Sequence, residues 1–513
     1  MKQKALWSKF RSVAMKRNSL TTAVVAGIAG VAGFAGLANA VNLNPDGLGQ
    51  VLIYPYYTVN KGQQTILSVV NTTDIGKAVK VRFLEGYNSR EVLDFNVFLS
   101  PHDVWVAAVT AADAADDASG GKLLTNDSSC IVQPGTVKNF VTYGFDGTTP
   151  GQGADAGPQT IDRTREGYFE VITMGDITPG SQLANAITHV GGSGVAPGTA
   201  VPADCSYVAG ASVATIEADL ELTPTGGLFG AAAVVNTDEG TYFGYNADAI
   251  DGFTESVVYT DSGSLQPSLQ QASTPSIATN GVARSYVFTG EGRLLTVDYA
   301  DGADAVSAVF MADAIYNEYN RQWDLMGASS DWIITFPTKR FYVDKVLYPT
   351  NPTSPFVQAF NGKSNITAAF TGYDREEQTS TLGGCDSPVG PDCFAKNPVL
   401  PYEVNALSFT AEKPTNGSTV LGSHLNSYII PYGLDGWAQI DLASGDGGHA
   451  LPRGVATDGS DVSLRGLPVT GFYATNIINN QLQGPDGNIL ANYSGVYRHR
   501  AHRSCVGTEA ACS

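Results

Sequence analysis

Hydrophobic and polar residues alternate along residues 78–85 of the chain. The apolar residues Val79, Val81 and Phe83 are separated by Lys80 and Arg82. A period of two is typical of a β-strand with one face in the core and the other in water. The pattern therefore predicts a strand whose apolar face is buried and whose cationic face is wet.

Four neighbouring segments carry the same kind of signal. The five predicted strands cover residues 51–57, 65–71, 78–85, 93–99 and 104–110. Turns rich in Gly, Asn and Asp separate them. Regular short strands of this sort are typical of an antiparallel β-sandwich.

One helical signal interrupts the strands, in residues 303–322. Apolar residues recur there at steps of four and three, and no Gly or Pro intervenes: Ala305, Val309, Ala312, Tyr316 and Tyr319. This spacing predicts one short helix that packs against a sheet. The other segments with a clear period are predicted as strands, among them residues 212–222, 331–336 and 341–343.

The first 40 residues have the order of a secretion signal. Six cations precede an apolar stretch from Leu20 to Leu37, and Ala38-Asn39-Ala40 closes it. We therefore predict a signal peptide over residues 1–40, a mature chain from Val41 and no transmembrane segment after cleavage. An uncleaved membrane anchor is the alternative interpretation of the same residues.

The remaining 473 residues are too many for one compact core. We predict a mainly β protein of two or three antiparallel β-sandwich (Ig-like) domains with long Gly/Asp-rich loops. The predicted sections are 41–215, with a loop excursion at 111–165, then 216–350, which holds the helix, and 351–513, which ends in a basic tail.

Six cysteines lie beyond the predicted signal peptide. An even number without a closely spaced zinc pattern indicates disulfides formed in an oxidising compartment. Because loop closure favours near neighbours, the predicted pairs are Cys130 with Cys205, Cys385 with Cys393, and Cys505 with Cys512.

The charge of the chain limits its partners. The net charge is −19, and without the six cations of the signal peptide 24 cations face 49 acids, a net charge of −25. Such a surface repels nucleic acids and anionic bilayers. Acidic turns at residues 298–304 and 458–461 are possible calcium sites, although neither matches the twelve-residue calcium loop. No other cofactor or metal site is predicted.

Aromatic residues are the strongest candidates for binding. Tyr54, Tyr56 and Tyr57 surround Pro55 in the densest cluster, and Trp332 and Arg340 belong to the aromatic run 331–345. Exposed aromatic side chains can stack on sugars or on another protein. The alternative is that these tyrosines face a sandwich core.

Signals for catalysis are weak. The nearest approach to a nucleophile elbow, Gly191-Gly-Ser193-Gly-Val195, lacks its last glycine. Carboxylates of interest for glycoside cleavage are Glu318, Asp331 and the run 374–377, each with an ordinary structural explanation. Arginines surround His499 and His502, which favours a basic clip on the chain's own acids over a metal site. No catalytic residue is predicted.

Four strings resemble those of an uncharacterised group of secreted or cell-surface proteins from proteobacteria. They are GQVLIYPYYTVN (49–60), VKVRFLEGYNSREVLDFNVFLSPHDVW (79–105), DWIITFPTKRFYVD (331–344) and RGLPVTGFYATN (465–476). The resemblance carries no known activity. It implies a location in the bacterial envelope, in the periplasm or outside the cell.

These observations together predict a secreted cell-surface or extracellular-matrix protein with a structural or adhesive role, not a catalytic one. Its expected partners are other surface proteins, further copies of itself or a polysaccharide. The alternative is a carbohydrate-binding protein or a glycan-active enzyme.

Overall fold

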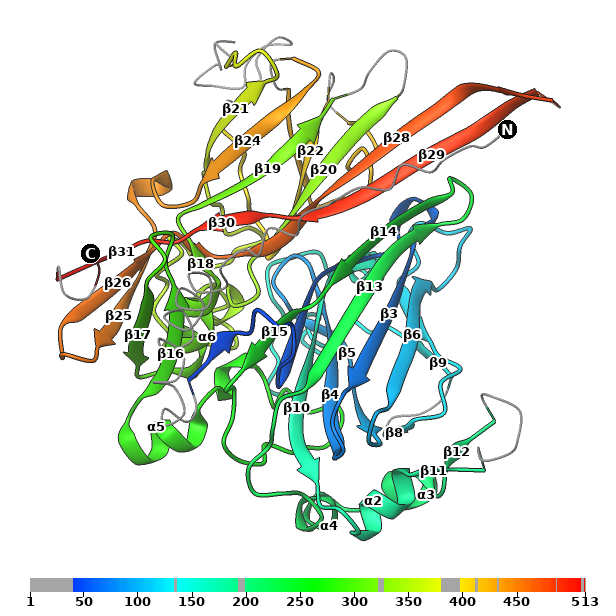
Figure 1. Ribbon diagram of the computed structural model, residues 1–513, viewed down its shortest axis with the longest axis vertical. Helices are drawn as coiled ribbons and strands as arrows, with labels where there is room; N and C mark the ends of the chain where they lie inside the picture. Colours follow the sequence, from blue (N-terminus) through cyan, green and yellow to red (C-terminus); the bar gives the residue numbers. More distant parts are fainter. Residues whose placement is uncertain are drawn as a thin grey trace, which may run out of the picture. The chain divides into compact units, whose positions relative to one another are not determined.

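The computed structural model describes residues 40–513 except for 133–135, 192–198, 322–326, 380–396, 411–413, 431–432, 486, 509–511 and 513 (Figure 1). The predicted signal peptide and the predicted pair Cys385–Cys393 lie outside the described residues. The protein is mainly β, with 44% strand and 12% helix. Ala40–Ser513 form one compact unit, so the section boundaries at 215/216 and 350/351 do not separate compact units.

Two sheets form an antiparallel sandwich. The seven-stranded sheet has the order β1 (Asn42–Leu43), β15 (Asp248–Asp251), β2 (Val51–Thr58), β10 (Glu166–Ile177), β4 (Gly76–Glu85), β5 (Glu91–Leu99) and β8 (Cys130–Val132). The six-stranded sheet has the order β14 (Thr241–Asn246), β13 (Leu228–Asn236), β3 (Gln64–Asn71), β6 (Val104–Ala111), β7 (Gly121–Leu124) and β9 (Val137–Asn139). The five strands predicted between residues 51 and 110 are therefore confirmed.

The seven-stranded sheet is buried on both faces. On β2, Leu52 and Tyr54 point into the core shared with the six-stranded sheet, whereas Val51 and Ile53 point into a second core. Every residue of β2, β4 and β10 is buried. The expected wet face of residues 78–85 is wrong, because a second layer covers it.

Three further sheets build the rest of the chain. The first has the order β16 (Ala283–Phe288), β17 (Leu294–Tyr299), β25 (Ala450–Ala456), β26 (Asp461–Arg465) and β31 (Cys505–Gly507). The second has the order β21 (Ala369–Asp374), β24 (Asp435–Asp441), β19 (Ala314–Asn320) and β30 (Arg500–His502). The third has the order β23 (Asn426–Ile429), β22 (Val404–Phe409), β20 (Ala328–Thr335), β28 (Thr470–Gly484) and β29 (Gly487–Arg498). Two short pairs complete the strands: β11 (His189–Val190) with β12 (Val201–Pro202), and β18 (Met311–Ala312) with β27 (Leu467–Pro468).

The prediction of a helix over 303–322 is correct for its first part and wrong for the rest. Helix α6 (Gly302–Phe310) is fully buried, and Asp301 caps it by accepting a hydrogen bond from the Ala303 amide. The chain then turns into β18 and β19. Strand β19 pairs with β24 on one side and β30 on the other, so tertiary pairing overrides the helical period of its Ile and Tyr residues.

Other helices replace predicted strands or loops. Ser212 caps α4 (Val213–Ala218) where a strand over 212–222 was expected, and α7 (Arg340–Val343) replaces the strand expected at 341–343. The described residues also include α2 (Gln182–Ile187), α3 (Cys205–Gly210) and α5 (Thr274–Asn280). The prediction of a single short helix is therefore wrong.

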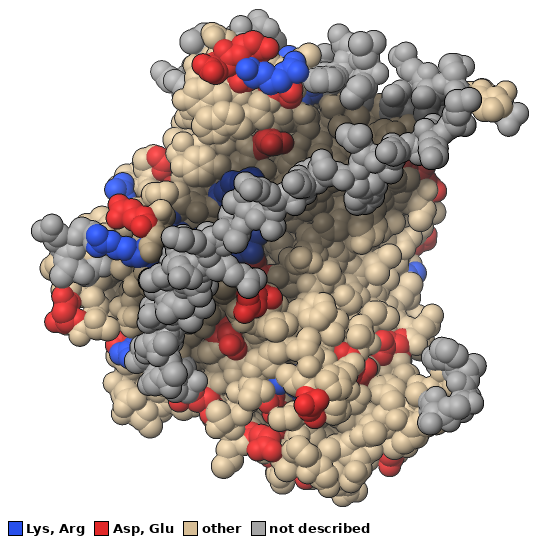
Figure 2. Space-filling view, viewed as in Figure 1, with Lys and Arg blue, Asp and Glu red and all other residues tan. Residues whose placement is uncertain are grey.

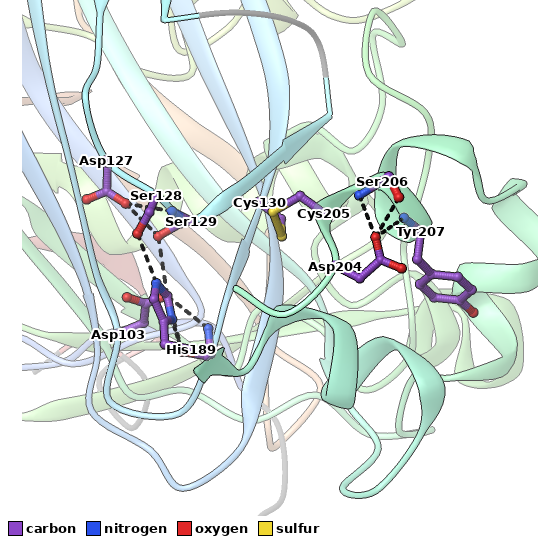
Figure 3. Close-up of a disulfide and its surroundings, with 11 residues drawn as sticks. Asp103, Asp127, Ser128, Ser129, Cys130, His189, Asp204, Cys205, Ser206 and Tyr207 are labelled. Carbon is purple, nitrogen blue, oxygen red and sulfur yellow. Dashed lines mark hydrogen bonds between the residues drawn. A yellow bond between two sulfur atoms is a disulfide. The ribbon is translucent and has the colours of Figure 1, made fainter. Parts of the chain in front are cut away.

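Two predicted disulfides are confirmed, Cys130–Cys205 and Cys505–Cys512. The first joins β8 to the start of α3 (Figure 3). Beside it, the His189 ring lies 3.2 Å from the hydroxyls of Ser100 and Ser128. No helix in the described part of the chain is long and apolar enough to cross a membrane.

Candidate functional site

The three predicted tyrosines of β2 are fully buried. The Tyr54 ring stacks on Phe169 with centroids 4.1 Å apart, and its hydroxyl donates to the carbonyl of Ser68. The Tyr56 hydroxyl donates to Glu166 Oε2 and that of Tyr57 to a backbone carbonyl. Burial raises the pKa of all three hydroxyls. The expectation of an exposed platform is wrong, and these residues belong to the sandwich core.

A glycine in the facing sheet accommodates this cluster. Gly230 of β13 lies opposite the Tyr54 hydroxyl, and a Cβ at position 230 would be 1.7 Å from that oxygen. Any side chain there would displace the ring. The glycine is thus explained by packing of Tyr54.

Trp332 and Arg340 are also buried, at 0% and 3% exposure. The indole Nε1 of Trp332 donates to the carbonyl of Glu318 at 2.8 Å. The Arg340 guanidinium donates to Glu170 Oε1 at 2.9 Å. These two residues therefore hold the 331–344 segment in the core, and neither presents a surface to a ligand.

The aromatic segments separated in sequence do meet in the fold. Thr335 Oγ1 donates to the carbonyl of Pro55 at 2.6 Å, and the Tyr168 hydroxyl donates to that of Pro337 at 3.1 Å. The two segments therefore meet in the interior of the fold and do not line a ligand groove.

Buried ion pairs surround this meeting point. The pairs, with their shortest distances, are Arg82–Glu91 (2.7 Å), Arg82–Glu170 (2.7 Å), Arg90–Asp344 (2.5 Å), Arg163–Glu85 (2.8 Å) and Arg163–Asp155 (2.7 Å). All of these side chains are at most 9% exposed. Buried charges must be paired. Here the pairs join β4 to β5, to β10 and to the 155–163 segment, and Arg90 to the residue that follows α7.

Lys339 and Glu403 are two buried ionisable groups near this network with strongly shifted pKa values. Burial lowers the pKa of Lys339 to about 7, and Lys339 Nζ donates to the carbonyls of Ser364 and Tyr402. Burial raises the pKa of Glu403 to about 8. The Glu403 carboxyl oxygens have no hydrogen-bond partner within the described residues. Because both side chains are enclosed, no substrate reaches them, and their effect is on stability.

The candidate carboxylates have structural roles or stand alone. Buried Asp331 accepts hydrogen bonds from Ser408 Oγ and from the amides of Val420 and Leu421. Asp374 caps the turn that follows β21. Glu318 is exposed on β19, and Glu376 and Glu377 are exposed in the turn after β21.

The basic tail docks on the chain's own acids, as its sequence predicts. Arg498 pairs with Asp248, and His502 lies 2.7 Å from Asp313. His499 is buried between Asn317 and the carbonyl of Ile333, and burial lowers its pKa to about 3. This ring is therefore neutral and structural.

Acidic turns proposed for calcium are engaged elsewhere. Asp298 pairs with Arg284 at 2.7 Å and Asp304 with Arg453 at 2.9 Å. Asp458 accepts from its neighbour Ser460. In the described part of the chain no group of three or more His, Cys, Asp or Glu is arranged to hold a metal ion.

The outer face of the six-stranded sheet is the most unusual exposed surface. Its side chains point away from the sandwich core and are apolar on four adjacent strands. We call it the apolar sheet face; its residues are Ile66, Ser68, Val70, Val104, Val106, Ala108, Phe229, Ala231, Ala233, Val235 and Tyr242. Five of these are large and 41–62% exposed: Ile66, Val104, Val106, Phe229 and Tyr242.

Strand register makes this face continuous. Val104 lies opposite Val70, which lies opposite Phe229. In a parallel row, Val106 faces Ser68 and Ser68 faces Ala231. The face contains no charged residue, and the surface over β13, β3 and β6 carries few charges (Figure 2). Contiguous apolar surface of this kind marks interaction sites.

This face is not among the predicted binding surfaces, although the sequence of β6 contains a pattern that indicates it. Residues 104–107 read Val-Trp-Val-Ala, so both faces of β6 are apolar. A one-sided strand would place polar residues at every second position. The buried Trp105 and the exposed Val104 and Val106 together account for the pattern.

Comparison with known protein families, with curated proteins and with solved structures finds no match to this chain. The geometry described above is therefore the basis for any functional conclusion.

Proposed function

We propose that this protein is a structural, adhesive component of the bacterial cell surface or extracellular matrix, and that copies of it associate through the apolar sheet face. This role requires export. The basic, apolar and small-residue order of residues 1–40 supports export, and the two disulfides fit an oxidising compartment.

The single observation that carries the proposal is the apolar sheet face itself. Phe229, Val104 and Val106 expose 41–45% of their surface to water on adjacent strands. Covering them with a second apolar face is favourable by about 25 cal/mol per Å² of buried surface. A flat sheet face is also suited to stack on another sheet at about 10 Å.

Charge favours a second copy as the occupant. The chain has a net charge of −19, so two copies repel each other wherever their acids meet. The apolar sheet face lacks charged residues, and contact there brings no acids together.

The area of the apolar sheet face sets the expected strength of association between two copies. Four strands of about seven residues, at a spacing of about 4.8 Å and a rise of about 3.3 Å, cover roughly 450 Å². Two copies would bury about 900 Å² in total, which is typical of weak contacts. Association should therefore depend steeply on concentration, as suits a protein that acts in a dense layer.

Sedimentation of the mature chain from Val41 tests the proposal. We expect reversible association that Val106→Lys weakens by at least about tenfold, because a cation within the patch must be desolvated. Phe288→Lys is the matched control, since Phe288 is 60% exposed on β16, outside this sheet. A chain that stays monomeric at all concentrations, or equal effects of both variants, would overturn the proposal.

A further inference from the structure

A second exposed surface has a different chemistry. The strands β21, β24, β19 and β30 form one sheet (Figure 1). Its outer face carries an aromatic and polar strip. We call it the Trp437 platform; its residues are Tyr316, Glu318, Thr371, Tyr373, Trp437 and Gln439. We propose that this platform binds a neutral polysaccharide. The proposal is independent of self-association through the apolar sheet face.

Two aromatic rings form the centre of the platform. Tyr373 and Trp437 lie directly opposite each other on β21 and β24. Their rings stack with centroids 4.8 Å apart and an interplanar angle of 18°. The stack fixes both rings without burying them, and Trp437 remains 44% exposed. By contrast, Trp105 and Trp332 are fully buried.

Polar side chains flank this stack in register. Glu318 lies opposite Trp437 on the side away from Tyr373, and Gln439 lies opposite both Tyr316 and Thr371. Side chains directly opposite one another have Cβ atoms about 5 Å apart. Hydroxyl, amide and carboxylate groups thus surround an exposed indole.

These polar groups are not used by the fold. The Glu318 carboxylate and the Gln439 amide have no hydrogen bond or ion pair with any residue in the described part of the chain. In the adjacent row, Asp435 is already paired with Arg375 at 3.0 Å. Glu318 and Gln439 therefore stay available to a ligand, the first as an acceptor and the second as both donor and acceptor.

Sugar rings match this combination. A pyranose presents an apolar C–H face, which suits an aromatic ring, and a rim of hydroxyls. Each hydroxyl can donate to a carboxylate while its oxygen accepts from an amide. An aliphatic partner would leave Glu318 desolvated and unpaired, at a cost in binding free energy. The platform therefore favours a hydroxyl-rich ligand over an apolar one.

Charge selects among sugars. Glu318 adjoins the aromatic stack, whereas Arg500 lies opposite Tyr316 at the edge of the strip, and the chain carries a net charge of −19. The carboxylate beside the stack and the negative net charge disfavour polymers that contain uronate or sulfate. A linear neutral glycan laid across the open strip is the ligand class that remains.

Affinity electrophoresis of the mature chain tests this assignment. The gels would contain a soluble β-glucan, a galactomannan, a xylan or, as the charged arm, a polyuronate. We expect retardation by at least one neutral polymer, reduced at least about tenfold by Trp437→Ala and less by Glu318→Gln. Trp437→Phe, which keeps a ring, should retain part of the binding.

Tyr143→Ala is the matched control, because Tyr143 is 58% exposed in a turn outside both this sheet and the apolar sheet face. Thermal unfolding of each variant verifies that the fold is intact. Quenching of Trp437 fluorescence by the bound polymer, absent in Trp437→Phe, gives a second readout. The assignment is overturned if no neutral polymer retards the chain, if only the polyuronate does, or if Trp437→Ala binds like the unchanged protein.

Discussion

The Arg340 guanidinium lies 2.9 Å from Glu170 Oε1, and the same oxygen accepts from Arg82 at 2.7 Å. One fully buried carboxylate thus serves two cations from different parts of the chain. Arg82 has a second anion in Glu91, but Arg340 has no other ion-pair partner within the described residues. Glu170 is therefore the group that compensates the charge of α7.

Glu170→Gln should destabilise the protein more than Arg340→Met. The first change leaves a buried cation uncompensated and should lower the free energy of unfolding by about 3 to 5 kcal/mol. The second leaves Glu170 paired with Arg82 and should cost less, about 1 to 3 kcal/mol. Urea unfolding measures both. Arg375→Met is the control, because its pair with Asp435 is largely exposed and such pairs contribute at most about 1 kcal/mol.

Glu403 should make stability fall as pH rises. Burial raises its pKa to about 8 in the folded chain, from an ordinary value of 4.5. Between these pH values the unfolded chain has lost a proton that the folded chain keeps, so stability decreases with pH. Glu403→Gln should match the unchanged protein near pH 5 and exceed it by on the order of 2 to 4 kcal/mol at pH 8. Equal pH profiles would contradict this account, and exposed Glu318→Gln is the control.

Lys339 should act in the opposite direction at higher pH. Burial lowers its pKa to about 7 in the folded chain, from an ordinary value of 10.5. Above pH 7 the unfolded chain binds the extra proton, so this group makes stability rise with pH. In Lys339→Met, urea unfolding between pH 7 and 10 should show a flatter profile than in the unchanged protein. A rise that persists in the variant would assign it to another group.

The two described disulfides should differ in their contribution to the free energy of unfolding. Cys130–Cys205 closes a separation of 75 residues and Cys505–Cys512 one of 7. By loop entropy, the first should contribute about 4 kcal/mol and the second about 2 kcal/mol. Thermal unfolding of the two double Ala variants should show the larger loss for the first. Added reductant should bring all three proteins to a similar stability, and a larger loss from the short loop would contradict the loop-entropy argument.

The strands of the sandwich follow from local alternation, but the burial of their polar faces does not. Lys80 and Arg82 alternate with apolar residues as on a wet face. In the fold they are at most 3% exposed, and their partners Asp94 and Glu91 come from the adjacent strand. The two-residue period of a strand shows which residues share a face, but not what covers that face. It therefore cannot predict a second layer that distant parts of the sequence contribute.

The same limit explains why the predicted binding residues are buried and not exposed. Tyr54 and Trp332 have the chemistry of binding residues, but their exposure depends on packing between segments some 280 residues apart, such as Thr335 on Pro55. Conversely, Trp437 and Tyr373 are separate in sequence, and only the pairing of β21 with β24 brings them together. The apolar sheet face has a local signal, because Val104 and Val106 flank Trp105. Of the two exposed surfaces, only this one is predictable from sequence.

The buried Asp331 carboxylate has a structural role that a substitution can test. Its two oxygens accept from Ser408 Oγ at 2.7 Å and from the amides of Val420 and Leu421 at 2.8 Å. In Asp331→Asn an NH₂ group must replace one of these acceptors and face a donor. We expect a loss of about 2 to 4 kcal/mol in the free energy of unfolding.

Hydrogen exchange locates that loss. The amides of Val420 and Leu421 should lose protection in Asp331→Asn before those of β22 do, because their acceptor is gone. Asp458→Asn is the control, since Asp458 is exposed and bonds only its own turn; it should change stability by at most about 0.5 kcal/mol. Unchanged protection at Val420 and Leu421 would mean that this carboxylate is not what holds the loop, and would return Asp331 to the candidates for chemistry.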